Sequence, residues 1–535
     1  MAGIDVHSVG SFHRMAGAAP RTAVTASRMA VTASRMAVTA SRMAGAAPRT
    51  AVTAPPRRRA RAPSIAGTRD PACEQRDPAR EQPGEEHDAV GAIFGTDGAR
   101  GRANEELTPE LALALGQGLV TLLHSEGQAR PSIILGRDPR WSGEMLEAAL
   151  IAGITSAGGD AVSVGVVPTP GVAHLTADSS AAAGAMISAS HNPVGDNGIK
   201  FFGAGGYKLT DDEEDELEAI VVAQSARRPT GTEIGRKLID PAAVARYIEH
   251  LASTADVDLS GLRIVVDGAN GAASNIAPQV YRQLGAEVVT IHCHPDGANI
   301  NEQAGSTYPD QICQAVVEHG ADAGISHDGD ADRLIAATHE GVEVDGDVIL
   351  AILARQMHHD GTLRENTVVT TVMTNLGFKR TMEGLGIEVV ETKVGDRYVL
   401  EAMRENGLNL GGEQSGHLID LDHATTGDGI LSAVRLLSTV RSTGATLKEL
   451  ATVMTRLPQV LVNVAGVDRA GLGGCESVWE AVRAEEARLG SQGRVLLRPS
   501  GTEALIRVMA EAPTEADAQH AVDVIADAVR DHLTV

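Results

Sequence analysis

From about residue 92 onward, the distribution of apolar and polar positions divides the chain into alternating strands and helices. Short apolar runs at 132–136, 161–167 and 262–267 have the length and composition of buried strands. Helical segments lie between them, and in the first, apolar residues from 111 to 122 recur at the spacing of one helix face. This alternation predicts α/β units in which crossover helices connect the strands of a sheet.

The same scheme repeats along the chain and then changes near its end. After about residue 455, two short strands and two helices, the last amphipathic, suggest a smaller α+β unit. We therefore expect three successive α/β mixed-sheet domains and one smaller α+β domain. Their expected bounds are 89–230, 231–337, 338–455 and 456–535.

The first 88 residues do not have the pattern of a folded domain. The sequence Ala-Val-Thr-Ala-Ser-Arg-Met recurs in tandem between residues 23 and 43, without a continuous apolar seam for a coiled coil. We expect a disordered low-complexity tail. Arg-rich, Ser-rich and acid-poor composition is also typical of a transit peptide, but perfect repetition favours translated upstream DNA and a misplaced start codon.

Charge and length limit the class of protein. A chain of 535 residues needs several domains. Its net charge of −24 combines about +10 over residues 1–69 with about −34 over the rest. An acidic body does not suit nucleic acid, and the apolar runs are too short for a membrane span. Widely spaced cysteines indicate free thiols in a reducing cytoplasm rather than a disulfide scaffold or zinc site; they are Cys73, Cys293, Cys313 and Cys475.

One polar stretch, Ser188-Ala-Ser-His-Asn-Pro193, follows a run of small residues. Because proline biases Asn192 out of the α region, we expect a turn that leaves Ser190 exposed on a rigid loop. A serine becomes a nucleophile when a base, cation or metal activates it, and His191 is adjacent. Most turns of this kind are structural, so the stretch alone does not establish catalysis.

Three aspartates alternate in the loop after a predicted strand, at Asp328, Asp330 and Asp332. In extended backbone they point the same way and offer hard oxygen ligands to one cation. An EF-hand calcium loop needs glycine and glutamate where Arg333 and His339 stand, so magnesium fits better. A solvated acidic turn is the alternative.

Three further glycine-punctuated stretches are shaped for phosphate or sugar, at 93–101, 412–417 and 498–503. With these five motifs in order, the chain from about residue 92 resembles the bacterial phosphoglucosamine mutases of the α-D-phosphohexomutase superfamily. The resemblance implies a magnesium-dependent cytoplasmic isomerase. It would interconvert glucosamine 6-phosphate and glucosamine 1-phosphate through a phosphoserine and a bisphosphorylated sugar, for amino-sugar and cell-wall precursor synthesis.

The resemblance also implies roles for individual residues. The metal would lie on Asp328, Asp330, Asp332 and the phosphate of Ser190. Gln414 stands where mutases acting on mannose and glucose carry methionine, and Ala504 replaces a usual proline. The catalytic set would be Ser190, Arg100, His191, Lys200, Arg333 and His417, with either Lys200 or His417 as the acid–base group. The substrate-binding set would be Glu413, Gln414, Ser415, Gly416, Arg498, Ser500, Gly501, Thr502, Glu503 and Arg507.

Other functions stay open at this point. A mutase of the same fold that prefers mannose or glucose phosphates is the nearest alternative. A metal-dependent sugar-phosphate phosphatase and a non-catalytic sugar-phosphate binder are weaker alternatives. We expect a small-molecule hexosamine phosphate as partner, without nucleic acid or membrane; a homodimer is a candidate assembly.

Overall fold

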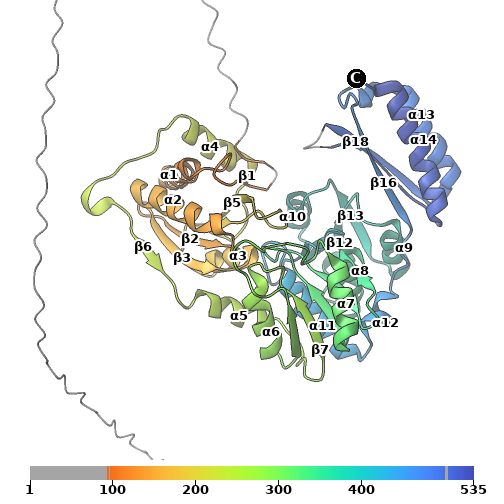
Figure 1. Ribbon diagram of the computed structural model, residues 1–535, viewed down its shortest axis with the longest axis horizontal. Coiled ribbons are helices and arrows are strands. Elements are labelled where there is room, and N and C mark those ends of the chain that lie inside the picture. Colours follow the sequence, from red (N-terminus) through yellow and green to blue (C-terminus); the bar gives the residue numbers. More distant parts are fainter. Residues whose placement is uncertain (1–92, 96, 501–503) are drawn as a thin grey trace, which may run out of the picture. The chain divides into compact units, whose positions relative to one another are not determined.

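The computed structural model describes residues 93–95, 97–500 and 504–535 (Figure 1). The segment 1–88, where we expected a disordered tail, lies outside the described residues. Four sheets follow one another along the described chain, three flanked by helices in α/β units and a smaller fourth. The predicted fold class is confirmed.

The first sheet has six strands in the order β1-β5-β4-β2-β3-β6. Strands β4, β2, β3 and β6 are parallel neighbours, whereas β5 pairs antiparallel with both β4 and β1. The strands are β1 (Ala99–Arg102), β2 (Ser132–Arg137), β3 (Asp160–Val166), β4 (Ala183–Ile187), β5 (Asp196–Gly203) and β6 (Lys237–Ile239). The helices are α1 (Pro109–Ser125), α2 (Trp141–Ala157), α3 (Thr169–Ala177), α4 (Asp211–Val222) and α5 (Ala243–Ser253).

The second sheet has five strands in the order β11-β10-β9-β7-β8. Strand β7 is parallel to β8 and β9, and β9 forms an antiparallel hairpin with β10 whose connection carries the three aspartates. The strands are β7 (Arg263–Asp267), β8 (Glu287–Ile291), β9 (Ala323–Ser326), β10 (Ile335–Thr338) and β11 (Glu343–Val344). The helices are α6 (Ala273–Gln283) and α7 (Pro309–His319).

The third sheet has four strands in the order β13-β12-β14-β15. Strand β12 is parallel to β13 and β14, and the β14–β15 hairpin carries residues 413–417. The strands are β12 (Thr367–Thr371), β13 (Glu388–Thr392), β14 (Leu410–Gly412) and β15 (Leu418–Asp420). The helices are α8 (Gly346–Asp360), α9 (Leu376–Leu385), α10 (Asp396–Glu405), α11 (Gly429–Thr443) and α12 (Leu447–Ala451).

The fourth sheet is antiparallel, with β18 (Leu505–Glu511) between β16 (Gln459–Ala465) and β17 (Arg494–Pro499). Helices α13 (Glu476–Leu489) and α14 (Glu515–Leu533) pack together against it (Figure 1). The predicted strands at 132–136, 161–167 and 262–267 differ from β2, β3 and β7 by one residue at one or both ends, where strand ends fray. Only two strands were predicted in the last unit, and β18 was missed.

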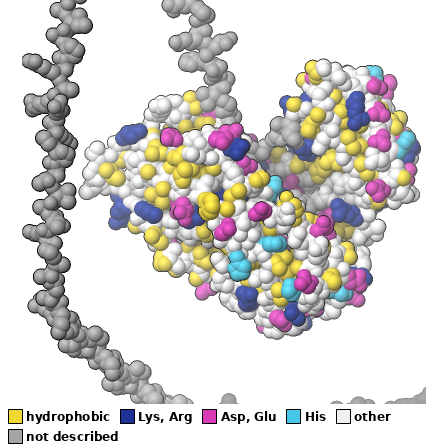
Figure 2. Space-filling model, viewed as in Figure 1, with side chains coloured by type: hydrophobic (Ala, Val, Ile, Leu, Met, Phe, Trp, Pro, Cys, Tyr) yellow, Lys and Arg dark blue, Asp and Glu magenta, His cyan; other side chains and the backbone are white. Residues whose placement is uncertain are grey.

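Buried apolar side chains anchor the loops that follow the strands. One cluster joins α1 and α2 to the first sheet, and another joins α5, α6, α8 and α11. A separate cluster lies between the fourth sheet and its helices. None of the helices in the described part combines the length and apolar composition that a membrane crossing requires. On the face drawn in Figure 2, acidic side chains are interspersed with basic and apolar ones.

Candidate active site

Ser190 lies in the turn after β4, with a backbone φ of +51°. This is the left-handed region, which residues other than glycine rarely adopt. The Asn192 N–H donates to the Ala189 carbonyl and closes the turn. The prediction that Ser190 would be exposed is wrong, since the residue is only 2% exposed. The aspartate loop covers it: a Cβ added at Gly329 would lie 2.5 Å from the Ser190 carbonyl oxygen.

The Ser190 hydroxyl faces the aspartate loop. Its Oγ donates to Asp328 Oδ2 at 2.5 Å and lies 3.4 Å from His191 Nδ1. Burial, together with the nearby Arg333 and Arg100 charges, lowers the pKa of His191 to about 4. The imidazole is therefore neutral near pH 7, and because the serine proton goes to Asp328, its Nδ1–H tautomer can donate to the Ser190 oxygen.

The three aspartates converge on one point after β9. One carboxylate oxygen from each of Asp328, Asp330 and Asp332 lies within 4.8 Å of the others. The extended backbone expected here is wrong: residues 329–331 form a turn, and Ala331 has a φ of +58°. The turn, rather than strand alternation, brings the carboxylates together.

These carboxylates fit a divalent cation. The Oδ1 atoms of Asp328, Asp330 and Asp332 are buried and accept no hydrogen bond in the structure. Burial, reinforced by repulsion from Asp332 and Asp330, raises the pKa of Asp328 well above its usual range. Three buried hard oxygens without a donor are the ligand set that magnesium prefers. The group can therefore hold a metal ion.

Seven side chains form a series of alternating charges that begins and ends on the aspartate triad, at Asp330 and Asp332; we call it the charge ring. Lys200 Nζ lies 3.3 Å from Asp330 Oδ2 and 3.0 Å from Asp97 Oδ2. Lys208 Nζ lies 2.6 Å from an oxygen of Asp97 and 2.6 Å from one of Asp396. His417 completes the ring, 3.6 Å from Asp396 and 3.5 Å from Asp332. The members, in order, are Asp330, Lys200, Asp97, Lys208, Asp396, His417 and Asp332.

The ring favours the charged forms of Asp97 and His417 against the effect of burial. Burial disfavours the charged form of Asp97, but Lys200 and Lys208 hold its pKa well below the usual range. Burial likewise opposes the His417 charge, yet hydrogen bonding and attraction to Asp332 raise its pKa to about 9. The ring thus ties the first three domains together at the site.

A cavity of about 310 Å³ adjoins Ser190 and the ring. The structure brings five of the six predicted catalytic residues to it. Lys200, Asp328 and Asp330 are buried and are not among the residues that line it. Arg100 pairs with Asp97, and Arg333 lies 3.8 Å from Asp332. The predicted residues at its wall are Ser190, His191, Arg100, Asp332, Arg333, Glu413 and His417.

The stretch 413–416 is only partly directed at this cavity. Glu413 lines it, and its Oε1 accepts the Gly395 N–H at 3.1 Å. Gln414 instead donates to Gln459 Oε1 at 3.4 Å, and Ser415 is exposed. Gly416 has a φ of +89°, and a Cβ there would lie 2.1 Å from the Leu334 carbonyl oxygen. The hairpin therefore needs glycine at this position.

Two of the predicted phosphate-binding residues, Arg498 and Arg507, lie on strands of the fourth sheet. Arg498 on β17 is the register partner of Arg507 on β18. Burial and the Arg507 charge lower the pKa of Arg498. The Ser500 N–H donates to the Leu505 carbonyl, and its own carbonyl accepts from Arg469 Nη1. Gly501, Thr502 and Glu503 lie outside the described residues. Among the described residues, those of this sheet do not line the cavity beside Ser190.

Sequence reasoning missed Asp97 and Lys208. Asp97 lies inside the motif at 93–101, three residues before the predicted catalytic residue Arg100. This position could have identified it as a site residue. Lys208 follows Gly205-Gly-Tyr207 with no motif around it, and only the fold places it between two carboxylates.

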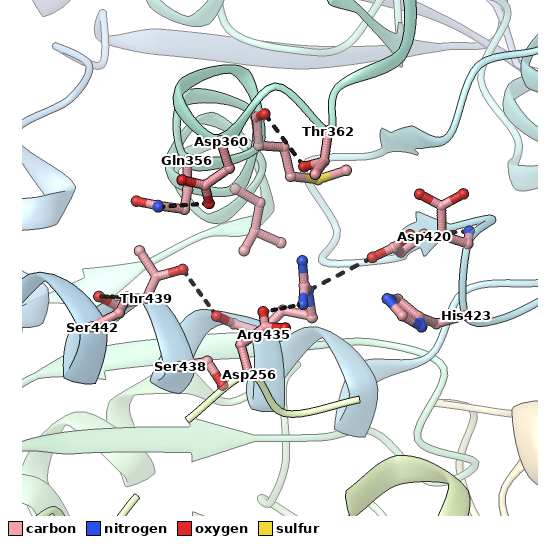
Figure 3. A pocket seen from close by; sticks show the side chains of 13 residues that line it. Asp256, Gln356, Asp360, Thr362, Asp420, His423, Arg435, Ser438, Thr439 and Ser442 are labelled. Atoms are coloured by element: carbon pink, nitrogen blue, oxygen red, sulfur yellow. Dashed lines mark hydrogen bonds and ion pairs between the residues drawn. The ribbon is translucent and has the colours of Figure 1, made fainter. Parts of the chain in front are cut away.

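A second cavity, of about 460 Å³, lies between α8 and α11 (Figure 3). Arg435 on α11 reaches Asp256 at 2.6 Å and Asp420 at 3.8 Å, which neutralises part of its acidic wall. Ser190 and the charge ring do not line this cavity.

Four family models match the chain in succession. They describe phosphoglucomutase/phosphomannomutase alpha/beta/alpha domains I, II and III and the C-terminal domain, at residues 91–228, 245–341, 345–457 and 460–528. The phosphoglucosamine mutase of Thermobifida fusca is 54% identical over 445 residues, which cover 83% of this chain and 99% of the relative. That of Heliobacterium modesticaldum is 52% identical over 464 residues, 82% of this chain and 100% of the relative.

The chain belongs to the phosphoglucosamine mutase family.

Solved structures from the wider superfamily share the fold of this phosphoglucosamine mutase family member. A phosphoglucomutase/phosphomannomutase family protein from Burkholderia thailandensis has a TM-score of 0.71 at 23% identity, covering 83% of this chain and 99% of that chain. The N-acetylphosphoglucosamine mutase of Aspergillus fumigatus, solved with GlcNAc-6P and magnesium, has a TM-score of 0.59 at 19% identity. It covers 82% of this chain and 95% of its own.

Proposed function

We propose that the protein interconverts glucosamine 6-phosphate and glucosamine 1-phosphate through a phosphorylated Ser190 and a bisphosphorylated sugar. The observation that carries this proposal is the Ser190 hydroxyl, 2.5 Å from Asp328 in a group of three converging carboxylates. The full-length similarity to phosphoglucosamine mutases supports the choice of sugar.

In each half-reaction one phosphorus–oxygen bond breaks and one forms. The phosphoryl group leaves Ser190 Oγ for a sugar hydroxyl, whose proton passes to a base; the serine oxygen is left to regain a proton. After the bisphosphate turns over in the site, its other phosphoryl returns to Ser190. Positioning and charge neutralisation dominate catalysis of this reaction.

Asp328, Asp330, Asp332 and the phosphate on Ser190 would hold magnesium, the cofactor we propose. When bound, magnesium neutralises charge on the transferring phosphoryl group. The chain's own cations do the same from other sides: Arg100 and Arg333 at the cavity wall and Lys200 behind it.

Proton transfer has two candidate groups. Lys200 lies between Asp97 and Asp330. Burial lowers its pKa, but the two carboxylate charges outweigh this effect and raise the pKa above its usual value. His417 lines the cavity, where its imidazolium is positioned to protonate a sugar oxygen. His191 Nδ1 lies 3.4 Å from Ser190 Oγ and supports the orientation of this hydroxyl.

We assign the choice of sugar to the third domain (338–455) and the distal phosphate to the fourth (456–535). Glu413 at the cavity wall is suited to the ammonium group of an amino sugar, and Gln414, Ser415 and Gly416 shape its hairpin. The first domain (89–230) carries Ser190 and the second (231–337) the metal. The distal phosphate would bind Arg498, Ser500, Gly501, Thr502, Glu503 and Arg507. We place the reaction in the cytoplasm.

The deciding measurement is kcat/KM for glucosamine 6-phosphate, glucose 6-phosphate and mannose 6-phosphate, with magnesium and a priming bisphosphate. We expect a preference for the amino sugar of at least about tenfold, or about 1.4 kcal/mol in transition-state binding. A Glu413→Gln variant should lose most of this preference while keeping activity on glucose 6-phosphate. An equal or opposite preference in the unsubstituted protein would refute the glucosamine assignment and leave the phosphoserine mechanism standing.

A further inference from the structure

We propose that Arg140, at the start of α2, is a positioning residue that holds Ser190 in its reactive conformation. The inference rests on the proposed role of Ser190 as phosphoryl carrier. We use the term serine loop for residues 188–196. Arg140 has no exposed surface and is among the largest fully buried side chains of the described residues.

The Arg140 guanidinium binds the serine loop from within. Nη2 donates to the carbonyls of Ser190 at 2.9 Å and Asn192 at 2.8 Å. Nη1 donates to the carbonyls of Pro193 and Asp196, the latter at 3.1 Å. A single side chain therefore contacts four carbonyl groups across seven residues of loop.

Asp138 couples the same guanidinium to the Ser190 backbone. Its Oδ2 accepts Arg140 Nε at 2.8 Å and the Ser188 hydroxyl at 2.6 Å. The Ser188 oxygen in turn accepts the Ser190 N–H at 3.0 Å. Both the N–H and the carbonyl of Ser190 are thus held by one network that begins at Arg140.

A second donor reaches the loop from the second domain. Asn301 Nδ2 donates to the Ser190 carbonyl at 2.8 Å and to the Asn192 carbonyl at 3.0 Å. These are two of the carbonyls that Arg140 also contacts. The serine loop is therefore fixed between the arginine of its own domain and an amide of the domain that carries the metal ligands.

This network explains how Ser190 keeps a φ of +51°. Such a conformation persists only where the surroundings over-determine it. With fewer donors the turn would relax, and Ser190 Oγ would move away from Asp328. Lysine is no substitute, because it presents three donors on one nitrogen and not a planar fork. Since a displacement of about 1 Å at a reacting atom costs about a hundredfold in rate, we expect a loss of that size in phosphoryl transfer.

The test follows the rate at which Ser190 acquires phosphate from glucose 1,6-bisphosphate, by rapid mixing and intact-mass spectrometry. In this step the bond from phosphorus to the sugar oxygen breaks and a bond to Ser190 Oγ forms; the serine proton leaves and the sugar oxygen gains one. We expect Arg140→Lys to lower the maximal rate about a hundredfold, with the half-saturating bisphosphate concentration within threefold of the unsubstituted protein. Arg130→Met is the matched control. Arg130 precedes β2 in the same domain, makes a bidentate pair with Asp160, and has no hydrogen bond to the serine loop.

The readout separates positioning from folding. A purely structural role would lower the amplitude of phosphorylation with the folded fraction and leave the rate per folded molecule unchanged, which overturns the proposal. If Arg140→Lys does not fold, Ser188→Ala decides: it removes the hydroxyl that joins Asp138 to the Ser190 N–H and leaves Arg140 in place. We expect a rate about tenfold slower with unchanged half-saturation. A rate equal to that of Arg130→Met in both variants refutes the inference.

The same experiment distinguishes a failure of the Arg140 proposal from a failure of the proposed function. If Ser190 of the unsubstituted protein acquires phosphate but glucosamine 6-phosphate is not converted, the substrate assignment fails and the Arg140 comparison still gives its answer. If Ser190 acquires no phosphate at all, both proposals are wrong.

Discussion

Lys208 joins the first and third domains inside the charge ring, and its removal should destabilise both at once. Its Nζ lies 2.6 Å from one oxygen each of Asp97 and Asp396. In a Lys208→Met variant, Asp97 keeps Arg100 and Lys200, whereas the nearest remaining cation of Asp396 in the ring is His417 at 3.6 Å. The variant therefore leaves two neighbouring carboxylates without the cation between them.

The structure sets the size of the effect. Breaking a buried ion pair on one side costs about 3–5 kcal/mol. The three side chains retain exposures of 14%, 24% and 20%, so water screens part of the exposed charge. We expect the lower end, about 3 kcal/mol, which corresponds to a fall of roughly 6–12 °C in the melting temperature of the affected domains.

Differential scanning calorimetry at pH 7.5 measures this change. Lys237→Met, a substitution of an exposed lysine on β6, is the matched control and should melt within about 2 °C of the unsubstituted protein. Adding Asp396→Asn to Lys208→Met removes one of the two carboxylates that lost this cation and should restore about half of the loss. Two results would refute this role of the ring in joining the domains. One is a Lys208→Met melting temperature equal to that of Lys237→Met; the other is a double variant that is less stable than Lys208→Met alone.

Two further predictions concern buried carboxylates. Asp330→Asn removes a metal ligand of nearly the same size, and we expect at least about tenfold weaker Mn²⁺ binding by electron paramagnetic resonance in the sugar-free protein; unchanged binding would contradict the aspartate site. Burial, with repulsion from Asp345, raises the pKa of Asp347 from 3.8 to about 7. The folded state then binds this proton more tightly, so the stability it contributes is complete below pH 4 and is lost as the pH rises to 7. At pH 8 the free energy of unfolding of Asp347→Asn should exceed that of the unsubstituted protein by about 2–4 kcal/mol, and at pH 4 the difference should be much smaller. Urea unfolding measures both; the same difference at pH 8 and pH 4 would disprove the prediction.

Much of the fold followed from the sequence because strand and helix periodicities are local. Strands β2 and β3 were predicted to within one residue at each end, since the burial of a short apolar run depends on a few neighbours. Ser190 and the aspartate triad were also predicted, because each lies in a motif with distinctive composition.

The charge ring and the serine network were not predictable in the same way. Lys208 and Asp396 are 188 residues apart and Arg140 and Ser190 are 50 apart, so only tertiary packing brings them together. The burial of Ser190 was mispredicted for a related reason. The turn was right, but the loop that covers it comes from another domain.

The left-handed backbone of Ser190 also has a bearing on which amino acid can carry the phosphate. Serine and threonine hydroxyls form phosphate esters by the same chemistry, so reactivity alone does not distinguish them. A threonine has a branched Cβ, and branched residues at positive φ are genuine outliers. At a φ of +51° the turn therefore accepts serine and disfavours threonine. In this chain the identity of the nucleophile is set by the shape of the main chain around it.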